Sequence, residues 1–195
     1  MNLRSIAFFI VMLLYLWMPF SMIREHQNTL SQGQIHLFRT RPVDPYDAFR
    51  GRYVALDIAE NQVNLQGQDP DRFRAGQTVY VTIGTDPQGY AFYESISTQH
   101  PDHSNYLQTT VLSLQEDQVY LNTPENLRRY YLNEKMAPLA EKVYRTLNRQ
   151  ARTVEKTAAA HLEVSVLDGA VIIRELFLEG QTVGAYLEQI NPEDF

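Results

Sequence analysis

The sequence predicts an α+β protein, in which an N-terminal transmembrane helix is followed by a mainly antiparallel β extracytoplasmic domain with one amphipathic helix. Three observations support this prediction. An apolar run without charge lies near the N-terminus, several later segments alternate with the period of a strand, and one segment repeats with the period of a helix. We therefore divide the chain into residues 1–23, a cytoplasmic tip and anchor, residues 24–33, a juxtamembrane spacer, and residues 34–195, the extracytoplasmic domain.

The anchor is predicted from residues 5–23, which carry no formal charge. As a helix this run is long enough to cross roughly 30 Å of hydrocarbon. Tyr15 and Trp17 lie toward its C-terminal end, where amphipathic rings suit the membrane interface. The alternative is a cleaved signal peptide, but the run is longer than usual for one and its exit has no Ala-x-Ala site. We therefore expect a retained anchor that contacts the lipid bilayer through residues 5–23.

The distribution of charge predicts the orientation and excludes some functions. Arg4 is the one charged side chain before residue 24, whereas 16 of the 17 basic residues and all 23 acidic residues follow it. The positive-inside rule then favours a cytoplasmic N-terminus and a periplasmic domain, on a single-pass protein of a bacterial inner membrane. The net charge of −6 argues against a nucleic-acid surface. A chain without cysteine has no disulfide, thiolate nucleophile or Cys-ligated zinc, and we expect no cofactor.

Eight segments are predicted as strands because they alternate apolar and polar residues or are rich in β-forming residues: 34–40, 52–58, 77–83, 90–96, 106–114, 118–121, 160–167 and 170–178. Residues 86–89 form a turn that makes 77–96 a hairpin. Asp168-Gly169 is typical of a type I′ turn between the last two strands.

The helix is predicted from Ala137 or Pro138 to about Thr153. Proline is suited to a first helical turn, and apolar residues recur every four positions after it. Its outer face is basic, which we interpret as a solvated surface in preference to a lipid or partner contact. That face carries Lys142, Arg145, Arg149 and Arg152.

Four arginines are the candidate binding residues: Arg39, Arg41, Arg50 and Arg52. They bracket Asp44 and Asp47, so one interpretation is an anion site for a carboxylate, a phosphate or a lipid headgroup. The alternative, which we favour, is that the two aspartates pair with arginines and hold a turn in shape.

No catalytic residue and no metal site is predicted. His100 and His103 share one loop with Asp102, but no further ligand is in register, and a solvated loop is the preferred interpretation. The serines lie in no hydrolase motif. A carboxylate pair for glycoside hydrolysis has no supporting motif. Tyr130-Tyr131 beside Arg128-Arg129 is a candidate ligand-stacking surface, but we favour the alternative that these aromatic residues pack in the core. The candidates for the carboxylate pair are Asp44, Asp57, Glu94 and Glu134.

Residues 39–58 resemble a bacterial family named for its Gly-Asp-Tyr-x-x-Leu-x-Tyr signature, the GDYXXLXY proteins. Gly51, Tyr53 and Leu56 fall on the signature, whereas Arg52 stands where Asp is usual and Ile58 where the final Tyr is usual. The similarity extends over most of residues 34–180. It implies a membrane-anchored protein of unknown biochemical function, in a family often associated with polytopic membrane proteins. We interpret the signature as a fold determinant, with Leu56 in the core and Gly51 supplying backbone freedom.

Two functions follow as hypotheses. The first is a non-enzymatic accessory protein whose extracytoplasmic domain binds another envelope or polytopic membrane protein. The second is a membrane-tethered enzyme or receptor for an anionic envelope ligand, held by the arginine cluster.

Overall fold

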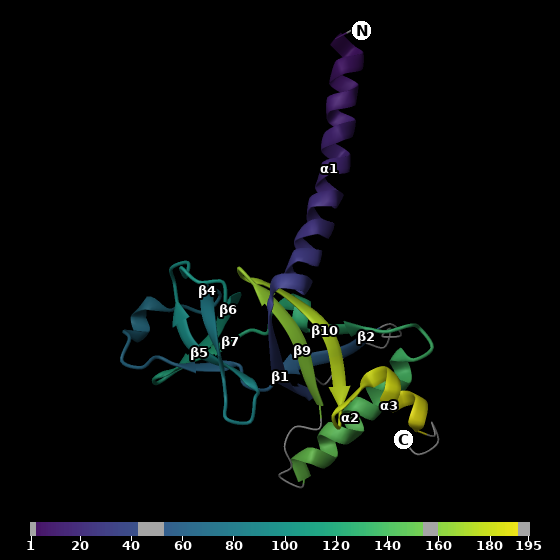
Figure 1. Cartoon of the computed structure of the whole chain (residues 1–195). Helices are drawn as coiled ribbons and strands as arrows, with labels where there is room; N and C mark the ends of the chain where they lie inside the picture. Colours follow the sequence, from purple (N-terminus) through teal and green to yellow (C-terminus); the bar gives the residue numbers. More distant parts are fainter. Residues whose placement is uncertain (1–2, 43–52, 154–159, 191–195) are drawn as a thin grey trace.

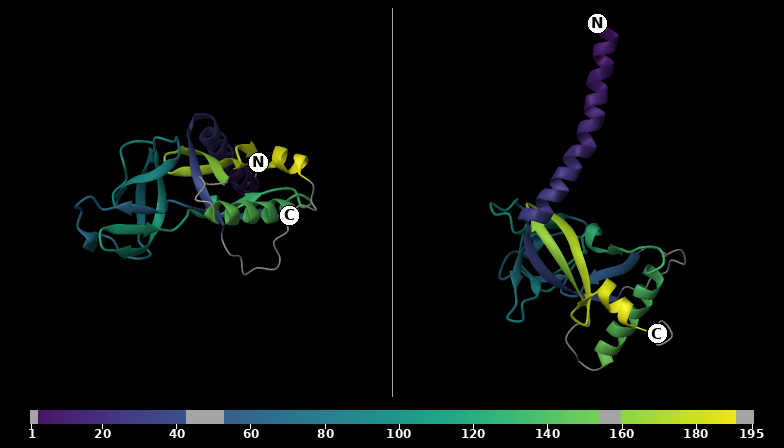
Figure 2. Two further views of the ribbon diagram at one scale, coloured as in Figure 1. Left: turned by 90° about the horizontal axis from the view of Figure 1, so that it is seen from below. Right: turned by 45° about the vertical axis from the view of Figure 1, so that its right-hand side comes forward.

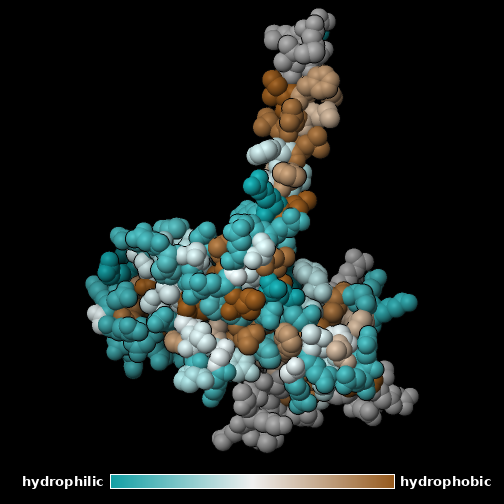
Figure 3. All heavy atoms as spheres, viewed as in Figure 1, coloured by the Kyte–Doolittle hydropathy of each residue, from teal (hydrophilic) through white to brown (hydrophobic). Residues whose placement is uncertain are grey.

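The computed structural model describes residues 3–42, 53–153 and 160–190. It opens with helix α1 (Leu3–Gln32), which projects from a β-rich domain and carries the N-terminus at its far end (Figure 1). This helix includes residues 24–32 of the spacer as well as the apolar run. Within the described part of the chain it is the one helix long and apolar enough to cross a membrane. Figure 3 shows the contrast, with apolar side chains gathered on α1 and a mainly hydrophilic domain below.

The domain contains two antiparallel sheets, which confirms the predicted fold class. The larger sheet has the order β11-β10-β9-β1-β2-β8 and the smaller one the order β3-β7-β6-β4-β5. Figures 1 and 2 show the sheets side by side, with helices α2 and α3 packed on the larger one. The strands are β1 (Gln34–Pro42), β2 (Tyr53–Ile58), β3 (Gln62–Asn64), β4 (Thr78–Thr85), β5 (Ala91–Ser97), β6 (Tyr106–Gln115), β7 (Gln118–Leu121), β8 (Arg129–Tyr131), β9 (Ala160–Leu167), β10 (Ala170–Leu178) and β11 (Gln181–Thr182).

The smaller sheet nearly closes into a barrel. Its two edge strands, β3 and β5, lie against each other. The side-chain amides of Gln66 and Gln68, just after β3, donate to the backbone carbonyls of Glu94 and Ile96 in β5, each at 3.4 Å. These bonds replace part of the missing strand ladder, since an edge otherwise leaves its backbone groups unpaired.

Helix α2 (Ala137–Thr153) occupies the range expected from its apolar period. Its buried face, which includes Ala140, Val143, Tyr144 and Leu147, packs against β1 and β2. Strand β2 alternates strictly, because Val54, Leu56 and Ile58 are buried while the residues between them are half-buried. Side chains from both sheets and from α2 join one hydrophobic core.

Several short elements were not predicted: β3, β8, β11, the 3₁₀ turns Pro70–Arg72 and Glu125–Leu127, and helix α3 (Val183–Gln189). Each is too short to show a period of its own, so its conformation depends on its neighbours. The turn between β9 and β10 does agree with its local signal. Asp168 and Gly169 both have positive φ, 48° and 82°, as a type I′ turn requires.

Helix α1 ends directly on the domain. The hydroxyl of Ser165 in β9 donates to the carbonyl of Thr29 at 2.5 Å, and the Arg174 guanidinium in β10 donates to the carbonyl of Leu30 at 2.7 Å. Both carbonyls belong to the last turn of the helix, where the intrahelical ladder ends, and the Thr29 carbonyl also accepts from the Gly33 N–H at 3.0 Å. Thr29 is buried as a result. The domain thus caps the helix and holds its end.

Candidate functional site: an arginine-lined cleft between the two sheets

A cleft of about 370 Å³ lies where the larger sheet meets the smaller one. One wall comes from β2 and β8 of the larger sheet. The other comes from Leu112 of β6, from the end of β7 and from the segment that connects β7 to β8. Three arginines reach it from different parts of the chain, Arg41 from β1, Arg128 from the connecting segment and Arg129 from β8.

Arg41 is held by Asp57, which lies opposite it in the ladder between β1 and β2. The Arg41 Nε and one terminal nitrogen donate to Asp57 Oδ2 at 2.7 and 2.6 Å. The other oxygen of Asp57 accepts from the Thr123 hydroxyl and from the Ile58 N–H. Since Thr123 follows β7, this carboxylate joins the two sheets at the base of the cleft.

Arg128 is positioned by two contacts within its own segment. Its Nε donates to the carbonyl of Thr123 at 2.9 Å, and a terminal nitrogen forms an ion pair with Glu125, also at 2.9 Å. The side chain remains 41% exposed. Part of the guanidinium therefore faces solvent with donors to spare, because a guanidinium carries five N–H groups.

Arg129 lies among aromatic rings rather than carboxylates. Its guanidinium carbon is 5.4 Å from the centre of the Tyr53 ring, and the Tyr53 and Tyr131 rings are 5.7 Å apart. A side-chain hydrogen bond with Tyr131 raises the pKa of Arg129 above its ordinary value. In the described part of the chain, Arg129 forms no ion pair.

The cleft is consequently electropositive. Its three arginines face two carboxylates, those of Asp57 and Glu125, which form ion pairs with Arg41 and Arg128, so Arg129 is left without an ion pair among the described residues. An anion that enters would meet guanidinium forks suited to a carboxylate or phosphate, beside the face of Tyr53.

Arg39 lies elsewhere, although it belongs to the predicted cluster. Its guanidinium donates to Glu60 at 2.8 Å, to Asp86 at 2.7 Å and to Gln88 at 2.5 Å, and it lies 4.1 Å from the centre of the Tyr90 ring. Burial raises the pKa of Asp86, but hydrogen bonds from backbone N–H groups and from the Arg39 guanidinium outweigh it, so the pKa lies below its ordinary value. Arg39 thus connects β1 to the β4–β5 hairpin and is occupied by these contacts.

Among the other predicted residues, Tyr53 borders the cleft and the Leu56 side chain is 1% exposed. Arg50, Arg52, Asp44, Asp47 and Gly51 lie outside the described residues. The predicted alternatives of an anion site and an aspartate-stabilised turn therefore stay predictions for these positions.

The histidine loop has its own contacts. The His100 Nδ1 donates to the carbonyl of Pro101 and its Nε2 accepts from the Tyr106 hydroxyl, both at 2.7 Å. Within the described residues there is no group of three or more metal-ligating side chains. One ring nitrogen of His100 thus bonds a backbone carbonyl and the other bonds Tyr106, and the ring packs against Tyr80 and Tyr106.

From the sequence, Arg128 and Arg129 were considered only as neighbours of Tyr130-Tyr131, and their proximity to Arg41 was not predicted. The pairing of β8 with β2, and of β2 with β1, brings them together. The local signal was the run Arg-Arg-Tyr-Tyr at residues 128–131, in which two charged residues precede two aromatic residues.

Comparison with known protein families finds a match to the family described as GDYXXLXY protein, over residues 15–176. The matched region begins within α1 and ends within β10, so it includes the cleft and both sheets. No curated protein and no solved structure matches the chain.

Proposed function

The chain belongs to the GDYXXLXY protein family, and from this premise we propose that it is a single-pass bacterial inner-membrane protein whose periplasmic domain binds and stabilises another envelope protein. The proposed role is that of an accessory subunit. It requires an anchor, a domain held in a defined position, and a surface for the partner.

The end of helix α1 carries this proposal. Residues 24–32 continue the helix beyond the apolar run, adding about 13 Å at the usual rise per residue. The last turn is then bound by Ser165 and Arg174. A flexible tether would let the domain turn freely, whereas a capped, continuous helix holds it at one distance and orientation. A fixed position favours a partner in the same membrane over a diffusing substrate.

The test is crosslinking of the native, full-length protein in cells, followed by extraction in mild detergent and mass spectrometry. A control carries an unrelated transmembrane helix in place of residues 5–23. We expect one stoichiometric membrane partner. Its loss in the control would assign the contact to the helix, and its retention would assign it to the domain. If no protein rises above background, the accessory role is wrong.

The cleft favours a second function, a receptor for a small anionic ligand. Arg41, Arg128 and Arg129 surround a volume suited to a small molecule. Isothermal titration calorimetry tests this function, with inorganic phosphate or glutarate titrated into the full-length protein in detergent. Binding that Arg128→Gln weakens would support it, and the absence of heat for both anions would contradict it.

A further inference from the structure

Strand β8 forms one edge of the larger sheet as far as the described residues go. It stands last in the strand order, and among the described strands it pairs with β2 alone. The Leu56 N–H donates to the carbonyl of Arg128 at 2.9 Å, so these opposite residues form a hydrogen-bonded pair. Such pairs alternate along an antiparallel ladder, and the next one is Val54 with Tyr130.

This register determines which backbone groups are free. The N–H and C=O of Tyr130 point toward β2, so those of Arg129 and Tyr131 point away from it, to the open side. An added strand would find two donors and two acceptors at the spacing that a ladder needs. Strand addition at a sheet edge is a common way to bind an extended peptide.

The side chains of β8 alternate between one that binds the domain and two that are exposed. The Tyr130 hydroxyl donates to the Glu175 carboxylate of β10 and ties the strand to the domain. Arg129 and Tyr131 are exposed, and the Tyr131 side chain is 66% exposed. A segment added to β8 would therefore lay alternate side chains over Arg129, Tyr131 and the neighbouring cleft.

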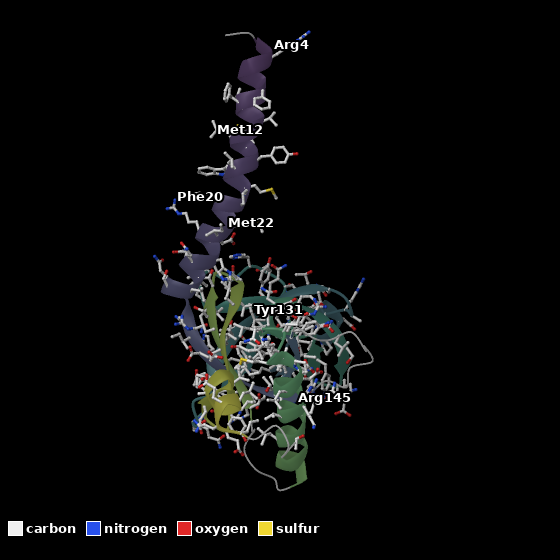
Figure 4. All side chains as sticks on the ribbon, turned by 90° about the vertical axis from the view of Figure 1, so that its right-hand side faces the viewer. Arg4, Met12, Phe20, Met22, Tyr131 and Arg145 are labelled. Atoms are coloured by element: carbon white, nitrogen blue, oxygen red, sulfur yellow. The ribbon has the colours of Figure 1, made fainter. Side chains whose placement is uncertain are left out.

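We propose that the edge of β8 binds an extended acidic segment of the partner protein, whose backbone pairs with Arg129 and Tyr131 and whose carboxylate lies against Arg129 and Arg128. The inference rests on the proposed accessory function and names the surface used. Charge complementarity selects the occupant, because Arg129 has no ion pair among the described residues. Figure 4 shows Tyr131 nearer to α1 than Arg145, so the edge lies toward the side of the domain from which α1 projects.

The edge also shows why a basic or neutral segment fits less well. Arg128 and Arg129 are adjacent, and a like charge laid directly across from them would repel them. A second copy of this chain would bring its own Arg128 and Arg129 to the interface. An acidic strand turns the same charges into ion pairs and hydrogen bonds.

The test measures binding of a short fluorescent peptide that alternates threonine and glutamate to the full-length protein in detergent, by fluorescence anisotropy. Its counterpart has glutamine in place of glutamate. Tyr131→Pro removes an outward N–H that β2 does not use, whereas Tyr131→Val keeps that N–H and removes the ring. We expect the glutamate peptide to bind more tightly than the glutamine peptide. Tyr131→Pro should abolish binding and Tyr131→Val should retain it.

Arg129→Gln gives an independent measurement that leaves the backbone unchanged. This substitution should weaken the binding of the glutamate peptide about tenfold, as expected for the loss of one charge-assisted hydrogen bond. The affinity for the glutamine peptide should stay unchanged. Equal affinity for the two peptides, or unchanged binding by Tyr131→Pro, would overturn the inference.

The outcome is separable from that of the proposed function. If a membrane partner is recovered with the wild-type protein and remains equally abundant with Tyr131→Pro, the accessory role stands and the β8 surface is wrong. If no partner is recovered from wild-type cells, the accessory role itself fails. A dimer of the chain that Tyr131→Pro separates would show that a second copy occupies the edge, and this would overturn the acidic-segment proposal.

Discussion

At the scale of single residues, Arg39 and Arg145 show how burial and the number of partners decide what an ion pair contributes to stability. Arg39 is 15% exposed and bonds two carboxylates and one amide, whereas Arg145 is 39% exposed and pairs with Glu141 one helical turn away. Replacing Arg39 by Gln leaves Glu60 and Asp86 without their shared cation. We expect Arg39→Gln to lower the free energy of unfolding by about 2 kcal/mol and Arg145→Gln by at most about 0.5 kcal/mol. Urea unfolding of the full-length protein in detergent measures both, and equal losses would contradict this account.

Two histidines give the domain a dependence on pH. Burial lowers the pKa of His36, whose Nε2 hydrogen-bonds the Asn105 amide oxygen, and also lowers the pKa of His161, which stacks on Phe177. As the pH falls below about 6.5, the unfolded chain binds protons that the folded chain does not, so stability must fall. Each histidine contributes at most about 1.4 kcal/mol per pH unit. The urea midpoint of the wild-type protein should be lower at pH 5.5 than at pH 8. The difference should shrink in the double variant with Gln at both positions, and an unchanged difference would assign it to other groups.

At the scale of elements, the joint between α1 and β1 depends on Gly33. A Cβ added there would lie under 3.0 Å from Ser165 Oγ and from the Thr29 carbonyl oxygen, which are the atoms that cap the helix. We expect Gly33→Ala to cost about 1–3 kcal/mol of unfolding free energy, as overpacking does. Gly184→Ala is a matched control, because a Cβ at Gly184 in α3 meets no atom within 4 Å. Urea unfolding should show no loss for the control, and a Gly33→Ala protein as stable as wild type would show that the joint is loose.

The elements also show how far the sequence determines this fold. The β9–β10 hairpin and helix α2 carry local signals, an Asp-Gly turn and an apolar period, and both occur where these signals predict. Strand β8 has three residues and no period, and it is a strand because β2 lies beside it. The cleft depends on the same pairing, since Arg41 meets Arg128 and Arg129 only once β1, β2 and β8 are in order. Arg39 meets Glu60, before β3, and Asp86, in the β4–β5 turn, and no spacing along the chain records those contacts.

At the scale of the whole molecule, the question is on which side of the membrane the domain lies. The apolar part of α1 is exposed along its length, as Figure 3 shows, and the domain is capped onto its other end. All of the acidic residues lie in or beyond the juxtamembrane part of the helix, and Arg4 precedes the apolar run. This asymmetry favours a cytoplasmic N-terminus with the cleft and the β8 edge in the periplasm.

The chain has no cysteine, so single substitutions report this orientation without background. Phe92→Cys places a thiol on an exposed position of β5, and Asn2→Cys places one before the apolar run. A membrane-impermeant maleimide should label Phe92→Cys in intact spheroplasts and label Asn2→Cys only after permeabilisation. The opposite pattern would put the domain in the cytoplasm and end the proposal of a periplasmic accessory protein. If Asn2→Cys stays unlabelled even after permeabilisation and the protein runs shorter than its full length, the apolar segment is cleaved. The domain would then lose the fixed distance from the membrane on which the accessory role depends.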